Sequence, residues 1–175
     1  MNVTKTPIEG LLIIEPAIHK DDRGYFFESY SEKLFGQNGI KTDFVQDNES
    51  KSSYGVLRGL HYQVNPTAQA KMVRVAMGEV FDVAVDIRKG SPTYGKWYGT
   101  ELTAENGRML YVPEHCAHGH QTLEESAEIL YMTSAYYTPS AVRGVRFDDP
   151  AFHIEWPLAA TRVSEQDRSW PLAER

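Results

Sequence analysis

The segment Gly55–Gln63 is the first candidate for chemistry, because it places an arginine and a histidine three positions apart. His61 offers an imidazole that can exchange a proton near neutral pH, and the forked guanidinium of Arg58 suits phosphate or carboxylate. Residues three apart in an unbroken strand point to opposite faces. Both therefore reach one pocket only if Gly59 forms a bulge or Arg58 lies at the strand edge. A purely structural histidine is the alternative for this segment.

Lys71 and Tyr131 are further polar candidates on predicted strands. Lys71 begins a strand ten residues after His61, and the same strand carries a second cation at Arg74. Tyr131 lies in the strand-like run 128–133. A tyrosine in such a strand is usually a core residue whose hydroxyl is bonded at the edge, so Tyr131 alone does not define a site.

A second histidine-rich segment, Pro113–His120, contains three histidines and a glutamate. In strand geometry His118 and His120 share a face, which is a spacing that two metal ligands can use. The sequence offers no second histidine pair of this kind with a suitably placed carboxylate. A pocket-lining role and a purely structural role therefore stand beside the metal site. Cys116 has no activating neighbours in the sequence, which disfavours a cysteine nucleophile.

The composition limits the classes of function. Of the 175 residues, 41% are hydrophobic and 24% are charged, as in an ordinary globular domain with an apolar core. The net charge of −6 disfavours nucleic acid and anionic membranes as partners, so any anion site must be local. The longest apolar run near the start, Leu11–Ile14, is too short for a signal peptide or a spanning helix. A single cysteine excludes an internal disulfide and favours a reducing cytoplasm.

Short strand-like runs follow one another at intervals of roughly ten residues. The clearest is Glu79–Ile87, which alternates with period two. Only two short helices are expected, one over Ser31–Phe35 with Ser31 as N-cap and Gly36 as its end, and one after Ser164. The pattern predicts one all-β domain, an antiparallel sandwich or barrel with an N-terminal arm and a short C-terminal tail. The other predicted strands are Gly24–Tyr30, Phe44–Asn48, Val56–Gln63, Lys71–Met77, Trp97–Leu102, Met109–Val112, His120–Leu123 and Glu128–Ser134.

Several long motifs occur in a specific order with little change in spacing. They are Asp22-Arg23-Gly24, Phe27-Glu28-Ser29-Tyr30, Phe44-Val45-Gln46-Asp47-Asn48, Val56–Gln63, Gly78–Arg88 and Ala117-His118-Gly119. In these motifs the chain resembles the dTDP-4-dehydrorhamnose 3,5-epimerase family from about Leu11 to Asp167. The resemblance implies a cupin-type antiparallel β-barrel, or jelly roll. It also implies a homodimer that works without a metal or other cofactor, with N-terminal strands exchanged between subunits.

The family's reaction inverts carbons 3 and 5 of a nucleotide-linked 4-keto-6-deoxy sugar to give dTDP-4-dehydro-L-rhamnose. Both carbons flank the ketone, so removal of either proton gives an enolate. This chemistry needs a base on one face of the sugar, an acid on the other, and positive charge at the developing oxyanion. By resemblance His61 is the base, Asp167 orients its ring, Tyr131 is the acid and Lys71 stabilises the enolate.

The same resemblance assigns roles in substrate binding. Tyr137 corresponds to the ring that stacks on thymine, and permanently charged arginines suit a diphosphate. The other implied contacts are Arg23, Glu28, Gln46, Asp47, Asn48, Arg58 and His118. The chain departs from the family at Val142 and Gln166, where a ligand-contacting glutamate and lysine are common. At His120 the family has an apolar or aromatic residue.

Three alternatives stand beside this interpretation. Relatives with the same scaffold epimerise only one carbon or act on other nucleotide-linked deoxysugars. A metal-dependent cupin enzyme would use His115, His118 and His120. A non-catalytic carbohydrate-binding barrel would account for the aromatic residues but not for the combination of base, acid and lysine.

Overall fold

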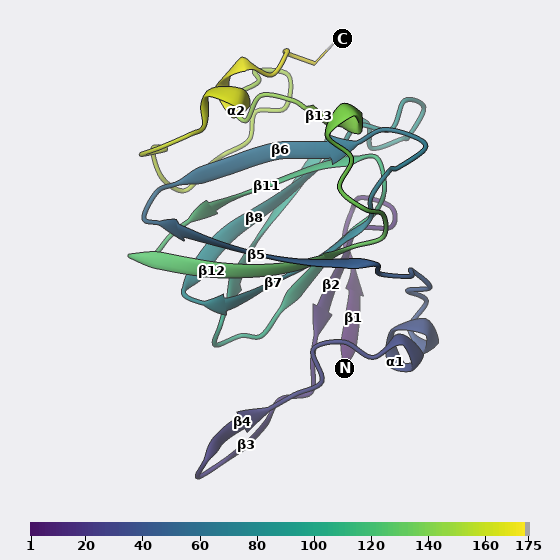
Figure 1. Ribbon diagram of the computed structural model, residues 1–175, viewed down its shortest axis with the longest axis vertical. Coiled ribbons are helices and arrows are strands. Elements are labelled where there is room, and N and C mark those ends of the chain that lie inside the picture. Colours follow the sequence, from purple (N-terminus) through teal and green to yellow (C-terminus); the bar gives the residue numbers. More distant parts are fainter. Residues whose placement is uncertain (174–175) are drawn as a thin grey trace.

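The computed structural model describes residues 1–173 and contains two sheets that face each other (Figure 1). All ladders within the two sheets are antiparallel. The first sheet has the order β1 (Asn2–Lys5), β2 (Leu12–Glu15), β10 (Met109–Val112), β7 (Lys71–Met77), β12 (Ser126–Thr133) and β5 (Gln46–Ser53). The second has the order β13 (Val142–Gly144), β6 (Leu57–Gln63), β11 (Cys116–Thr122), β8 (Glu79–Asp86) and β9 (Trp97–Thr103).

Few elements lie outside the two sheets. Strands β3 (His19–Asp21) and β4 (Gly24–Phe26) form a hairpin that projects away from the barrel (Figure 1). The helices are α1 (Glu32–Gln37), the 3₁₀ turn η1 (Pro139–Ala141) and α2 (Glu165–Ser169), which lies over β6. Within residues 1–173, no helix has the length and apolar character needed to cross a membrane.

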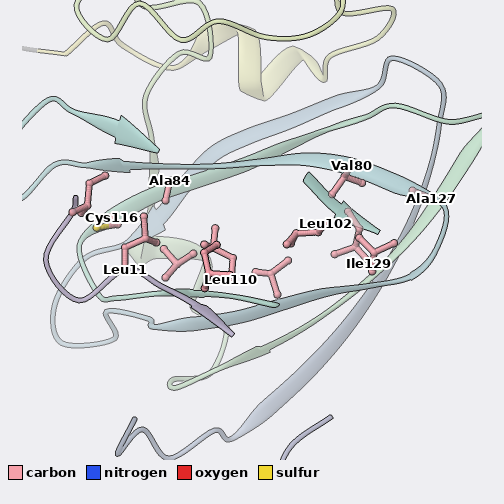
Figure 2. Close-up of a cluster of buried hydrophobic side chains, with 13 residues drawn as sticks. Leu11, Val80, Ala84, Leu102, Leu110, Cys116, Ala127 and Ile129 are labelled. Carbon is pink, nitrogen blue, oxygen red and sulfur yellow. The ribbon is translucent and has the colours of Figure 1, made fainter. Parts of the chain in front are cut away.

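The period-two pattern of β8 divides its side chains between two apolar clusters. Val80 and Ala84 point between the sheets into a core that also contains Leu102, Leu110 and Ile129 (Figure 2). The opposite face of the strand packs against the chain that follows β13, in a cluster that includes Val83, Val85, Val145 and Phe152. Both faces of this sheet are therefore covered, which explains why β11 is buried along its whole length.

The all-β prediction is confirmed, and most predicted strands form with shifted ends. Strands β7 and β10 have the predicted bounds. The strand predicted at Gly24–Tyr30 is wrong beyond Phe26, where the hairpin ends. The strand predicted at Phe44–Asn48 begins instead at Gln46 and continues to Ser53. Its inward side chains are polar, so they give no apolar alternation that would mark the strand.

Other element boundaries also needed correction. Strand β11 begins at Cys116 rather than His120, and β1, β2, β3 and β13 were not predicted. Ser31 and Ser164 cap α1 and α2 as expected, but Gly36 lies inside α1. The turn at Asp21–Gly24 joins β3 to β4.

A bulge in β6 places Arg58 and His61 on the same side of the sheet. On β11, His118 pairs with His61 and His120 pairs with Arg58, so two steps along β11 correspond to three along β6. Gly59, with φ +133°, accommodates the extra residue. A Cβ atom at this glycine would lie 2.6 Å from the Cα of Gly119. The bulge that the sequence required for a shared pocket is therefore present.

We expect Gly59→Ala to lower the free energy of unfolding by about 2–4 kcal/mol, because the methyl group meets backbone atoms and the positive φ strains any L-residue. Urea denaturation measures the change. Gly36→Ala is the matched control, since its Cβ has no neighbour within 4 Å and its helical position favours alanine. A loss at Gly59 no larger than the change at Gly36 would contradict the tight approach of β6 to β11.

Candidate active site

Two adjoining cavities share the side chains of His61, Lys71 and Tyr131. The outer cavity has a volume of ≈ 350 Å³ and the inner cavity one of ≈ 180 Å³. His61 comes from β6 in one sheet, whereas Lys71 and Tyr131 come from β7 and β12 in the other. The residues predicted as base, enolate-stabilising cation and acid therefore meet where the cavities join, and they approach this point from opposite sheets.

A carboxylate from the C-terminal segment holds the ring of His61. The Nε2 atom of His61 lies 2.5 Å from Oδ1 of Asp167, and the amide of Gly59 donates to Oδ2 at 3.2 Å. Burial opposes the charge of Asp167, but these bonds outweigh it and hold the pKa of the carboxyl below its ordinary value. An ionised carboxylate only accepts hydrogen bonds, so Nε2 carries the proton. The lone pair of His61 is then on Nδ1, as general-base catalysis requires.

Helix α2 places this carboxylate. The Ser164 hydroxyl accepts from the amide of Asp167 at 3.0 Å, which closes the first turn. Trp170 follows the helix and packs edge-on against His61, with ring centroids 6.2 Å apart. A Cβ atom at Gly144 would lie 2.4 Å from the Trp170 ring, so this side chain fills the space over the glycine. The predicted contact between His61 and Asp167, 106 residues apart, is present in the structure.

Lys71 is a buried cation at the start of β7, an interior strand of the first sheet. Its side chain lines both cavities, and Nζ donates to the carbonyl oxygen of His61 at 3.3 Å. Burial lowers the pKa of Lys71 from 10.5 to about 8, although the negative charge of Asp82 acts in the opposite direction. The ammonium form still predominates near neutral pH. It lies where an enolate oxygen would gain most from a nearby cation, because few waters screen the interaction.

Tyr131 lies on β12, opposite β6 across the cavity. The ring packs against the apolar core, while the side chain lines both cavities. Burial raises the pKa of its hydroxyl, although Arg58 acts in the opposite direction. The phenol therefore keeps its proton near neutral pH, as a general acid must.

Asp82 is a site residue that the sequence interpretation missed. Its side chain is fully buried, and Oδ1 lies 2.8 Å from Nε2 of His118, which lines the inner cavity. This second histidine–carboxylate pair lies beside the first, because His118 and His61 are paired across β11 and β6. The sequence did contain a signal for Asp82, because it lies between Val80 and Ala84 on the apolar face of a strand. An acidic residue is rarely buried in such a place without a partner.

Arg58 lines the inner cavity and is held by β5. Its Nε donates to the Ser52 hydroxyl at 2.9 Å, and its Nη2 donates to the Lys51 carbonyl at 3.1 Å. Among residues 1–173, the side chains that line the two cavities include no Asp or Glu. Asp82 and Asp167 lie behind histidines. Cations thus face the cavities of an acidic chain, an arrangement that favours an anionic ligand.

Amide and aromatic side chains surround the outer cavity. The amide of Gln46 donates to Asn48 at 2.8 Å, and its oxygen accepts from the backbone amide of Tyr137 at 3.0 Å. The Tyr137 ring is 61% exposed at this cavity, which leaves its face free to stack on a planar group. Val142 and Gln166, where the chain departs from the family pattern, also line the outer cavity.

Three residues predicted to bind substrate lie outside the outer and inner cavities. Asp47 is exposed and alternates with the inward-facing Gln46 and Asn48, so it points away from the site. Arg23 and Glu28 lie on or next to the projecting hairpin and are exposed. Arg23 pairs with Asp21 at 2.5 Å, with 85% of its side chain exposed.

The histidine-rich segment does not assemble the ligand set proposed for a metal. His115 lies before β11 with φ +60°, while His118 and His120 line the inner cavity. Within the described part of the chain, no three His, Cys, Asp or Glu side chains are grouped so that they could hold a metal ion. Burial raises the pKa of the Cys116 thiol to about 12, so this cysteine is a poor nucleophile.

Comparison with known proteins yields consistent matches over nearly the whole chain. A family profile described as dTDP-4-dehydrorhamnose 3,5-epimerase matches residues 5–174. A protein of Shigella flexneri with the name dTDP-4-dehydrorhamnose 3,5-epimerase is 52% identical over 168 residues, which cover 95% of this chain and 93% of the relative.

Solved structures share the fold. The dTDP-6-deoxy-D-glucose-3,5-epimerase of Legionella pneumophila, in complex with dTDP-4-keto-L-rhamnose, has a TM-score of 0.94 at 46% identity and covers 98% of this chain and 92% of its own. A 3'-monoepimerase of Streptomyces bikiniensis, in complex with dTDP-quinovose, has a TM-score of 0.89 at 33% identity and covers 95% of this chain and 85% of its own.

We expect Lys71→Met to raise the free energy of unfolding at pH 7 by up to about 3 kcal/mol, because the folded protein no longer holds a buried ammonium. Above about pH 8 the folded state releases this proton while the unfolded chain keeps it up to about 10.5, so the penalty of Lys71 falls with rising pH. The gain should therefore be largest below pH 8 and smallest near pH 10.5.

Urea denaturation of both proteins at pH 7 and pH 10 measures the difference. Lys33→Met, at an exposed position in α1, is the matched control and should change stability by less than about 0.5 kcal/mol at either pH. A destabilised Lys71→Met variant at pH 7 would show that Lys71 is not held at an energetic cost.

Proposed function

This chain belongs to the dTDP-4-dehydrorhamnose 3,5-epimerase family, and we propose that it inverts carbons 3 and 5 of dTDP-4-dehydro-6-deoxyglucose with His61 as base, Tyr131 as acid and Lys71 as the stabiliser of the enolate. The observation that supports the proposal most strongly is the placement of His61, bonded to Asp167, on the sheet opposite Tyr131. Lys71 lines the same junction. The product serves deoxysugar biosynthesis.

Removal of the proton is the first step. Nδ1 of His61 takes the proton from the carbon next to the ketone, the electron pair of the C–H bond forms the C=C bond of the enolate, and the π pair of the C=O bond moves to the oxygen. The imidazolium that forms is stabilised by Asp167, which accepts from Nε2. The enolate oxygen gains the positive charge of Lys71, whose ammonium is already desolvated in the unliganded protein.

Return of the proton must occur on the opposite face of the sugar. Tyr131 donates its phenolic proton to the same carbon, which inverts the configuration and restores the ketone. A base on β6 and an acid on β12 can flank the sugar ring, because the two strands belong to opposing sheets. Before the next step the phenolate regains a proton from solvent and the imidazolium of His61 releases one, both through the outer cavity.

The nucleotide part fits the outer cavity. Tyr137 offers an exposed ring for the base, and the amides of Gln46, Asn48 and Gln63 surround the opening. Lys71, which lines both cavities, and Arg58 in the adjoining inner cavity supply positive charge that suits a diphosphate. The substrate class that we propose for this chain is therefore a nucleotide-linked sugar. The location that we propose is a reducing cytoplasm, which the single cysteine favours.

A second copy of the chain completes the site in this proposal. The projecting hairpin carries Arg23 and exposes 61% of Tyr25 and 67% of Phe26. Exposed aromatics on a projecting element are typical of a contact surface, and β5 leaves one sheet edge open. In a homodimer, the hairpin of one subunit would carry Arg23 and Glu28 to the outer cavity of the other.

We expect His61→Asn and Tyr131→Phe to differ in a diagnostic way. Without its base, His61→Asn should lose about 10²–10⁴-fold of both deuterium uptake from solvent and product formation. Tyr131→Phe should still exchange protons through His61, but the inverted product should fall sharply because no acid serves the other face. Mass spectrometry and NMR of the sugar in deuterium oxide measure both quantities on one sample.

The same measurement tests the alternatives. Full activity of His61→Asn would exclude His61 as the base. Equal loss of exchange and inversion in Tyr131→Phe would show that Tyr131 positions the substrate. Inversion at carbon 3 alone by the unaltered enzyme would make it a monoepimerase, like the Streptomyces relative described above. The matched control is Thr67→Val. The Thr67 hydroxyl is buried, has no hydrogen-bond partner and lies outside both cavities.

We expect Arg23→Ala and His61→Asn to complement each other when the two inactive chains are expressed together. A mixed dimer would contain one site with both defects and one site with neither. Random pairing should then restore about a quarter of the wild-type activity. Light scattering checks that the species is a dimer. A mixture that stays as inactive as the separate variants would place Arg23 in the site of its own chain or in no site.

A further inference from the structure

His120 is a histidine of the inner cavity that the reaction described above does not use. It is 7% exposed and lies on the inward face of β11, where it is paired with Arg58 on β6 and with Asp82 on β8. Its Nε2 atom is buried and has no hydrogen-bond partner. An unpaired polar atom in a protein interior lowers the stability of the folded state by about 1–3 kcal/mol. A ligand group that hydrogen-bonds such an atom would offset this cost.

The surroundings of His120 keep its ring neutral. Burial is the largest cause, and electrostatic interactions with His118, Arg58, His61 and Lys71 add to it, so the pKa of His120 falls to about 3. The carboxylate of Asp82 faces the same region from β8, with Oδ1 bonded to His118. A neutral imidazole offers one donor and one acceptor, and rotation about its broad χ2 torsion exchanges which nitrogen faces the cavity.

The expected orientation of the sugar brings one polar group to this wall. This step rests on the proposed function: the nucleotide is attached to carbon 1 and occupies the outer cavity, so carbon 4 lies toward the inner cavity. The two carbons that flank carbon 4 carry a hydroxyl on carbon 3 and a methyl group on carbon 5. The inner cavity is lined by groups that match this pair, the polar ring of His120 and the apolar side chain of Ile129.

We propose that His120 is a specificity-determining residue that hydrogen-bonds the 3-hydroxyl of the sugar and so selects sugars with this hydroxyl over their 3-deoxy counterparts. The selection follows from an asymmetry between two costs. A sugar with the hydroxyl satisfies the unpaired nitrogen, whereas a 3-deoxy sugar leaves it buried and unpaired. His120 acts on binding and orientation and takes no proton from the sugar.

The test measures deuterium exchange at carbon 5, which both sugars carry. The two probes are dTDP-4-keto-6-deoxyglucose and dTDP-4-keto-3,6-dideoxyglucose. We expect the unaltered enzyme to prefer the first in kcat/KM by at least about 10-fold. His120→Phe keeps a ring of similar size without the nitrogens and should lose most of this preference. Thr122→Val, an isosteric change on the same face of β11 outside the cavities, should keep it.

The remaining outcomes each decide the matter. An unchanged preference in His120→Phe together with a lower melting temperature would overturn the proposal. It would show that the His120 ring has a structural role beside Asp82. His120→Met is a second apolar variant with a flexible side chain and answers the same question if His120→Phe does not fold. Equal rates with both sugars in the unaltered enzyme would overturn this inference alone. Exchange into neither sugar would overturn the proposed function and this inference with it.

Discussion

The close approach of two backbones, at Gly59 on β6 and Gly119 on β11, is the constraint on which the site depends. A Cβ atom on either glycine would lie within 3.0 Å of the other strand's backbone, so the two strands meet here without side chains between them. The extra residue in β6 turns Arg58 to the same side as His61. It also directs the amide of Gly59 to Asp167, so one local irregularity fixes both the base and the carboxylate that orients it.

Charge is distributed so that each acidic group of the site has its own histidine. Asp167 binds His61 and Asp82 binds His118, while Lys71 and Arg58 face the cavities without a carboxylate in front of them. This separation lets a chain of net charge −6 present positive potential to an anionic ligand. Removal of Asp82 would leave the buried ring nitrogen of His118 without its partner.

The sequence indicated the fold class because β8 alternates with period two, and because β7 and β10 belong to a series of short strand-like runs at regular intervals. Strand β5 was harder to define because its inward side chains line a cavity and are polar. Motifs identified His61, Lys71 and Tyr131, and the structure brings them together. Asp82 escaped notice because an acidic residue within an alternating strand reveals no partner until the register with β11 is known. Arg23 and Glu28 lie on or next to the projecting hairpin, outside both cavities of the site.

Helix α2 has only five residues, far fewer than an isolated helix needs to persist in water. It is held by the Ser164 cap, by the bonds of Asp167 and by Trp170 against Gly144. Local opening of this segment would leave both sheets intact while releasing the ring of His61 from Asp167. The fraction of molecules with an oriented His61 ring is therefore set by the opening equilibrium of this short C-terminal segment rather than by the stability of the barrel. Warming can thus lower the activity while the barrel stays folded.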